Sequence, residues 1–212
     1  MTTTEEFHGK IGRSYQESEE WWPEPIRPHP DAPNVIIFLL DDVGFGQLSR
    51  TFGGLIDTPN IDRLAENGLR FNDFHTTALC SPTRGSLMTG RNPHTIGLGS
   101  HSLTAMGFPG YNAMVPPSCK TLANYLGEAG YVNYALGKYD PTPLYEVSQI
   151  GPFDRWPSGE GFHHAYCFMA ADVHQFVPVM WNDHHPEPHR ISDHLDQDLA
   201  DRAIEWITGH KS

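Results

Sequence analysis

A largely apolar run over residues 34–40, rich in β-branched side chains, constrains the fold of this chain most strongly. It is too short for a typical helix, and such runs are typical of strands buried on both faces of a parallel sheet. The run ends in Asp41 and Asp42. Ligands of open α/β sheets bind beyond the carboxyl ends of strands, so we predict a ligand site at these two carboxylates.

The next stretch predicts a β–α–β unit. Thr58 and Pro59 are typical of the start of a helix, and Gly68 is typical of its end. Residues 69–75 then alternate between apolar and polar side chains, which indicates a second strand. A parallel crossover of this kind is almost always right-handed.

Further elements extend the pattern. We predict short helices over 82–89 and 119–128, a third strand over 131–136, and an amphipathic helix over 192–207. Together they favour an α/β fold with a doubly wound, mostly parallel sheet that carries helices on both faces and is incomplete at the C-terminus. Residues 1–33 form a Pro- and Trp-rich N-terminal extension, whose tryptophans we expect to pack on the main body.

Composition excludes several classes of function. The formal charge of −12 over 212 residues argues against a nucleic-acid partner, which requires a basic surface. No apolar run approaches the ~20 residues of a membrane span, and the N-terminus lacks a leader pattern, so we expect no membrane partner and a cytoplasmic location. Three cysteines, Cys80, Cys119 and Cys167, are too few and scattered for a disulfide framework.

The stretch Leu79–Gly85 combines three features of an anion site. Pro82 is favoured in the first turn of a helix, whose unpaired N–H groups and positive dipole end would then point toward Cys80. Residues four apart share a helix face, so Arg84 is expected on the same side as Cys80. Lys138 follows the predicted third strand and should reach the same edge of the sheet.

The sequence contains two candidate metal sites, each with an alternative interpretation. Asp41 and Asp42 offer the oxygen ligands that Ca²⁺ or Mg²⁺ takes, although a loop capped by two solvated aspartates fits the same residues. The His-rich stretch over 184–189 offers ligands for a transition metal, but its prolines favour a solvated loop.

Taken together, these motifs resemble the sulfatase family of the alkaline phosphatase superfamily, in particular the large bacterial arylsulfatases. The resemblance covers residues 7–212, and identifies 34–212 as the N-terminal portion of a catalytic domain. It rests on Ala32–Val35, Leu40–Gly44, Thr58–Asp62, Cys80–Arg84 followed by Thr89–Arg91, Gly137–Lys138, and Gly151–Pro157.

The resemblance implies a sulfuric ester hydrolase. By it, a formylglycine-generating enzyme converts Cys80 into formylglycine, whose hydrated aldehyde is the nucleophile toward a small sulfate-ester substrate. Asp41, Asp42 and the diol at residue 80 would hold Ca²⁺, with Mg²⁺ as the alternative cation. Arg84 would stabilise the diol, and Lys138 would be both a catalytic and a substrate-binding residue.

Two departures from the family pattern bear on function. Asp140 stands where the family usually has a histidine, and His163 or His164 is a candidate substitute. Family catalytic domains are roughly twice as long as this chain, with further metal ligands in the second half, so we expect a truncated fragment with little activity alone. A non-catalytic remnant and a phosphonate or phosphate ester hydrolase are the alternatives.

Overall fold

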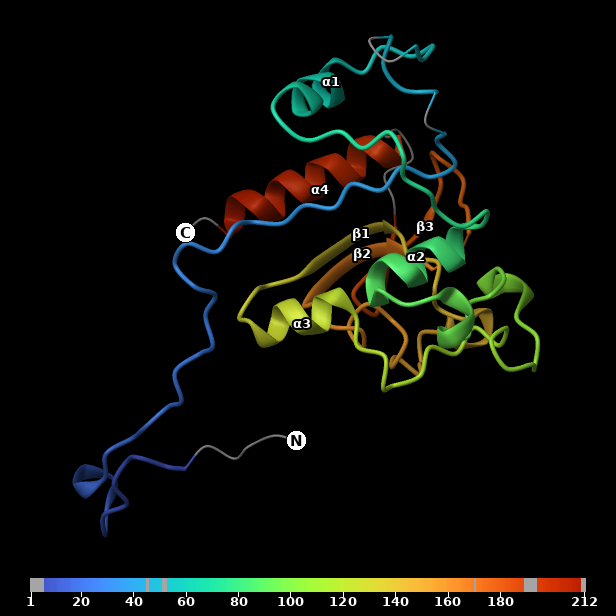
Figure 1. Ribbon diagram of the computed structural model, residues 1–212. Helices are drawn as coiled ribbons and strands as arrows, with labels where there is room; N and C mark the ends of the chain where they lie inside the picture. The colour runs from blue at the N-terminus through green and yellow to red at the C-terminus, as the bar shows by residue number, and fades with distance from the viewer. Residues whose placement is uncertain (1–5, 45, 51–52, 170, 189–193, 211–212) are drawn as a thin grey trace.

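The computed structural model describes residues 6–44, 46–50, 53–169, 171–188 and 194–210, and shows an α/β fold (Figure 1). The described residues form four α-helices, four strands and several short 3-10 turns. The α-helices are α1 (Pro59–Glu66), α2 (Cys80–Thr89), α3 (Leu122–Glu128) and α4 (Leu195–Gly209). The strands are β1 (Tyr134–Lys138), β2 (His164–Phe168), β3 (Val179–Asn182) and β4 (His185–Pro188), and the 3-10 turns are η1 (Tyr15–Glu17), η3 (Pro93–Ile96), η4 (Ser102–Thr104) and η5 (Leu144–Glu146).

The sheet among these residues is mixed, with the strand order β1-β2-β3-β4. β1 pairs with β2 in parallel, so that Tyr134 lies opposite His164 and Lys138 opposite Phe168. β3 and β4 continue the sheet as antiparallel strands. The predicted α/β class with an alkaline-phosphatase-like sheet is confirmed, with one parallel pairing in the described part.

Alternation along β2 divides the core between two faces of the sheet. Ala165 and Cys167 pack with Trp156, which is fully buried. Tyr166 and Phe168 face the other way, into a cluster that includes Leu195 of α4. Figure 1 accordingly shows α4 on one side of β1 and β2, and α3 on the other.

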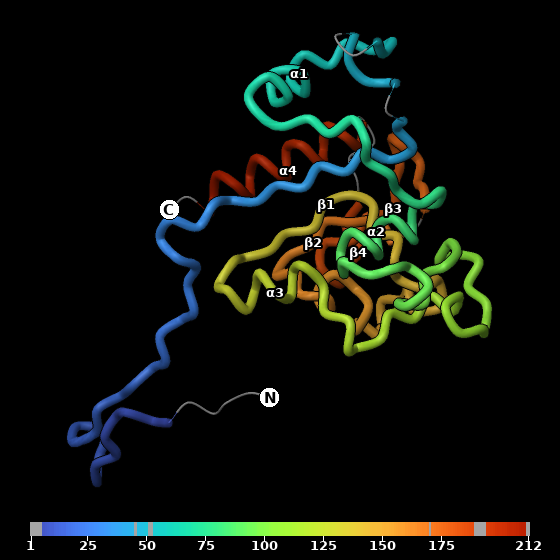
Figure 2. The backbone as a smooth tube through the Cα atoms, in the orientation of Figure 1, coloured from blue at the N-terminus to red at the C-terminus, as the bar shows by residue number. Residues whose placement is uncertain are grey.

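The predicted strand over 34–40 is wrong. The segment is extended but forms no strand (Figure 2). Ile36 and Phe38 are 75% and 80% exposed. A strand of this kind needs ladder partners on both edges and covered faces. Nothing in the described part of the chain supplies that environment, because the described partner strand of β1 is β2.

The predicted strand over 69–75 is also wrong, so the β–α–β unit does not form. Leu69 and Phe71 are 89% and 69% exposed. The helix between the two segments does form as α1, with Pro59 as its first residue, but it has no buried residue. The local start and stop signals are therefore sufficient to form α1, although none of its residues is buried.

Other boundaries shift for identifiable reasons. α2 begins at Cys80 rather than Pro82. α3 begins at Leu122 rather than at 119, because Thr121 and Asn124 form a capping box in which each side chain accepts from the other's backbone N–H. β1 spans 134–138, later than predicted, and the predicted start of α4 at 192–193 lies outside the described residues.

The N-terminal extension has little regular structure apart from η1. Trp21 packs edge-on against Phe7 and His8 of the same segment, and Trp22 is 77% exposed. The expected packing of the tryptophans on the main body is therefore wrong. No helix in the described ranges has the length and apolar character to cross a membrane.

Candidate active site

Cys80 is the first residue of α2, and tertiary packing fixes this helix. Gly85 allows the helix to lie directly on a buried cluster, because a Cβ at this position would come within 2.5 Å of Leu98 and 3.0 Å of Ile96. Leu79 precedes the helix in an extended conformation, and its carbonyl accepts from the N–H of Thr83 at 3.2 Å. The thiol thus lies beside the N-terminal end of the helix, where the dipole favours negative charge.

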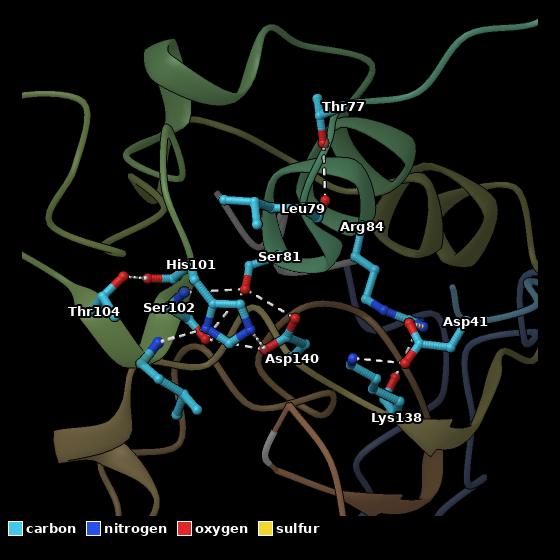
Figure 3. Close-up of polar contacts among 11 residues, drawn as sticks. Asp41, Thr77, Leu79, Ser81, Arg84, His101, Ser102, Thr104, Lys138 and Asp140 are labelled. Carbon is cyan, nitrogen blue, oxygen red and sulfur yellow. Dashed lines mark hydrogen bonds and ion pairs between the residues drawn. The ribbon is translucent and has the colours of Figure 1, made fainter. Parts of the chain in front are cut away.

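Two cations converge on one carboxylate beside Cys80. Lys138 Nζ lies 2.8 Å from Asp41 Oδ2, and Arg84 Nη2 lies 3.1 Å from Asp41 Oδ1 (Figure 3). Arg84 Nη1 also donates to the carbonyl of Lys138 at 3.4 Å. The Lys138 and Arg84 side chains are 9% and 13% exposed, so this charge is largely shielded from solvent.

These contacts shift the pKa values of the partners in opposite directions. Burial alone would raise the pKa of Asp41, but hydrogen bonds from Lys138 and Arg84 outweigh burial and lower it. Burial alone would lower the pKa of Lys138, but its bond to Asp41 and the nearby Cys80 and Asp140 raise it. Lys138 is therefore a fixed positive charge over the physiological range.

A second cluster also includes Cys80. Ligand-type atoms of Cys80, His101 and Asp140 all lie within 4.8 Å of one another. His101 Nε2 is 3.8 Å from Asp140 Oδ1. Figure 3 shows His101 beside Asp140, and the charge of Asp140 also acts on Lys138. Among the described residues this is the one group of three such ligands.

Asp140 is 1% exposed and accepts two serine hydrogen bonds. Ser81 Oγ donates to Oδ2 at 2.8 Å, and Ser102 Oγ donates to Oδ1 at 3.1 Å. The N–H of Ser102 donates in turn to Ser81 Oγ at 3.0 Å. The carboxylate thus ties together the start of α2, η4 and the chain after β1.

The environment of Cys80 works against a free thiolate. Burial raises the pKa of the Cys80 thiol, and the hydrogen bond and charge of Asp140 raise it further, whereas Lys138 acts in the opposite direction. A nucleophilic thiolate requires a depressed pKa. The geometry therefore does not favour thiolate chemistry at this position.

The carboxylate pair fits a hard cation only in part. Asp41 and Asp42 offer the right kind of oxygen, and Asp42 is exposed, with a φ of 53°. Both oxygens of Asp41, however, face Arg84 and Lys138. Ca²⁺ takes 6–8 oxygen ligands, so these two residues would supply only part of its shell.

The structure places His163 and His164, the candidate substitutes for the missing family histidine, far from Lys138. In the parallel register His164 lies opposite Tyr134, at the far end of β1 from Lys138, about 13 Å away at ~3.3 Å per residue. His163 Nδ1 accepts a hydrogen bond from the backbone N–H of Asn133 at 3.1 Å. The tertiary structure instead brings His101 to Asp140, and no spacing in the sequence indicates that residue.

The His-rich stretch does not form a transition-metal cluster in the described part of the chain. His184 stacks on Phe153 with ring centroids 4.0 Å apart and bonds Ser158 at 2.6 Å. His185 is the first residue of β4 and is exposed, and His189 lies outside the described residues.

Comparison with known proteins identifies the family. The model of the Sulfatase family matches residues 33–212. The chain belongs to the sulfatase family. An uncharacterized sulfatase of Schizosaccharomyces pombe is 35% identical over 154 residues, covering 68% of this chain and 26% of the relative. The arylsulfatase of Klebsiella aerogenes is 33% identical over 148 residues, covering 69% of this chain and 30% of the relative.

A solved structure resembles the chain in fold. The crystal structure of Ps i-CgsB has a TM-score of 0.64 and 26% identity, and the match covers 80% of this chain and 40% of that one. The chain spans less than a third of the length of each of the two curated relatives named above.

Proposed function

We propose that the protein hydrolyses sulfate esters, with residue 80 as the nucleophile. The observation that carries the proposal is the pair of shielded cations, Arg84 and Lys138, beside the first residue of α2. The buried Nε of Arg84 has no hydrogen-bond partner among the described residues. Converging donors of this kind stabilise the charge that develops on a tetrahedral oxyanion.

The nucleophile in this proposal is formylglycine, made from Cys80 by a formylglycine-generating enzyme. When hydrated, it supplies a geminal diol, one oxygen of which attacks sulfur while the S–O bond to the ester alcohol breaks and the alcohol leaves. The other hydroxyl then loses its proton, the C–O bond to the sulfate breaks, and the aldehyde is regenerated. Lys138 binds the sulfate group, and Arg84 holds the diol and offsets negative charge. The raised pKa of the Cys80 thiol supports this reading, because the unmodified residue is a poor nucleophile.

A divalent cation, Ca²⁺ or Mg²⁺, would be held by Asp41, Asp42 and the oxygens of residue 80. It would supply positive charge to polarise the sulfate group. Chelation should abolish turnover, and Ca²⁺ should restore it. The Asp42→Asn variant should need more Ca²⁺ for half-maximal activity, whereas a variant at exposed Asp73 should not.

The modification itself has a direct test. The protein is co-expressed with a formylglycine-generating enzyme, and the peptide that contains residue 80 is weighed. Formylglycine lowers its mass by about 18 Da, unlike the ordinary oxidation of cysteine, which adds oxygen. A peptide that keeps the full mass of cysteine, while a known substrate peptide is converted beside it, would contradict the proposal.

Two alternatives use the same observations. The cationic volume also fits a phosphate or phosphonate ester, which is likewise a tetrahedral anion. A non-catalytic remnant fits the exposed apolar side chains over 34–40. We expect the 212 residues by themselves to show little turnover, since they supply only part of a cation shell, and robust hydrolysis by this chain would contradict that expectation.

A further inference from the structure

The cluster of Cys80, His101 and Asp140 is not used by the roles proposed above for Arg84 and Lys138. Its members come from three separate segments: the first residue of α2, the residue before η4, and the second residue after β1. Their meeting within 4.8 Å is therefore a product of the tertiary structure, which places a carboxylate and an imidazole beside the reactive position.

Hydrogen bonds hold the Asp140 carboxylate in one orientation. Each of its oxygens accepts from a serine hydroxyl, and the side chain is 1% exposed. Both of its oxygens therefore already have a serine partner. One of its oxygens, Oδ1, faces His101.

The proton of the neutral His101 ring is assigned by its other contact. The N–H of Leu103 donates to Nδ1 at 3.2 Å, so Nδ1 is an acceptor and the ring proton sits on Nε2. Nε2 lies 3.8 Å from Asp140 Oδ1, in the volume that also contains the side chain of Cys80. The ring is thus an N–H donor directed at this volume, with 18% of the side chain exposed.

We propose that His101 is a further donor residue of the site, which hydrogen-bonds through Nε2–H to the oxygens carried on residue 80. Asp140 is its positioning residue, since it fixes the ring and the start of α2 together. This inference rests on the proposed function, because the oxygens that His101 would bind exist only after conversion of Cys80. The Asp140 carboxylate, itself held by Ser81 and Ser102, keeps the ring in place while the Nε2–H bond strengthens as the oxygens become negative.

Three variants at residue 101 separate this role from the capping of η4. His101→Asn keeps a short acceptor for the Leu103 N–H but lacks the distal donor. His101→Gln places an amide N–H near the position of Nε2, and His101→Ala removes both functions. His164→Gln, at the far end of β1 and β2, is the matched control.

With the complete protein as the cell makes it, after conversion of Cys80, His101→Asn and His101→Ala should each lower kcat for an aryl sulfate by about tenfold or more, with KM little changed. His101→Gln should recover part of that loss, and His164→Gln should match the parent. Full turnover by His101→Asn would overturn the donor role, whatever its effect on thermal stability.

A second readout does not need hydrolysis. In the unconverted chain, the rate of Cys80 alkylation by anionic iodoacetate is divided by the rate with neutral iodoacetamide. Asp140→Asn should raise this ratio about threefold by removing a negative charge, and His101→Asn should lower it about twofold by removing an anion donor. If no variant hydrolyses sulfate but these ratios shift as stated, the proposed function fails and the placement of His101 and Asp140 stands. Unchanged ratios would overturn the placement.

Discussion

At the scale of single residues, the site depends on the close pairing of one carboxylate with two cations. Arg84 and Lys138 lie 54 residues apart in sequence, yet Arg84 bonds the Lys138 carbonyl and both side chains hold Asp41. The motifs predicted that these three residues belong to one site. Their pairing with each other, rather than with a cation or a substrate, was not predictable from spacing.

Lys138 is the residue whose removal should be most informative. Lys138→Ala removes the most shielded positive charge beside residue 80, so in the complete, converted protein kcat/KM for an aryl sulfate should fall by roughly 100-fold or more. Lys138→Arg keeps the charge and should retain more activity than Lys138→Ala. Steady-state kinetics measure these values. A fall in kcat/KM of less than threefold in Lys138→Ala would exclude Lys138 as a sulfate-binding residue.

The residues that sequence reasoning missed are those held by tertiary structure alone. His101, Ser81 and Ser102 meet Asp140 because η4 packs against the start of α2. Ser81 lies within the Cys80–Arg84 motif, but nothing in its type or spacing indicates a bond to residue 140. The resemblance marks position 140 as a departure from the family pattern, whereas the approach of His101 to Asp140 is visible only in the tertiary structure.

At the scale of elements, helices with local start and stop signals were predicted well and isolated strands poorly. α1 and α2 lie close to their predicted ranges, because proline, capping residues and glycine act within a few residues. The segments 34–40 and 69–75 have the composition of strands without forming them. A strand depends on partners elsewhere in the fold, and composition alone cannot supply them.

Gly137 tests how β1 carries Lys138 to the site. It lies within β1 with a φ of +82°, and a Cβ there would meet Leu199 of α4 at 3.3 Å. Gly137→Ala should lower the free energy of unfolding by about 1–2 kcal/mol, because a side chain disfavours this backbone conformation.

Gly107→Ala is the control for that substitution. An added Cβ at Gly107 meets nothing within 4 Å, so its unfolding free energy should stay within about 0.5 kcal/mol of the parent value. Denaturant melts of both variants measure the difference. Equal stabilities would show that the backbone at 137 relaxes without strain.

At the scale of the whole molecule, pH dependence of stability should follow a buried carboxyl group. Glu160 is 8% exposed and accepts a hydrogen bond from Tyr139. Burial raises the pKa of Glu160 to about 7, although the Tyr139 bond and Arg155 partly oppose the shift. The folded chain thus binds a proton that the unfolded chain releases near its ordinary pKa of ~4.3.

The sign of the effect follows from this difference. The contribution of Glu160 to stability is fully present below pH ~4.3 and is lost as pH rises to about 7, by up to roughly 4 kcal/mol. Glu160→Gln cannot ionise and should lack this component. Urea melts between pH 5 and 8 should therefore show a shallower decline for the variant, and parallel curves would contradict the assignment.

Several large apolar side chains are exposed in the described part of this sulfatase chain. The matched relatives continue well beyond the section it covers, since it spans 26% and 30% of the two curated relatives compared. Phe38, Leu69 and Phe71 are exposed in the described part. Apolar surface of this kind is normally covered in a folded protein.

The most direct test of the account is the catalytic preference of the complete protein as the cell makes it, after conversion by a formylglycine-generating enzyme. We predict that kcat/KM for 4-nitrophenyl sulfate exceeds that for 4-nitrophenyl phosphate by about tenfold or more, and that Cys80→Ala abolishes both activities. A preference for the phosphate ester, or sulfate hydrolysis that survives Cys80→Ala, would contradict the assignment of residue 80 as the nucleophile of a sulfate ester hydrolase.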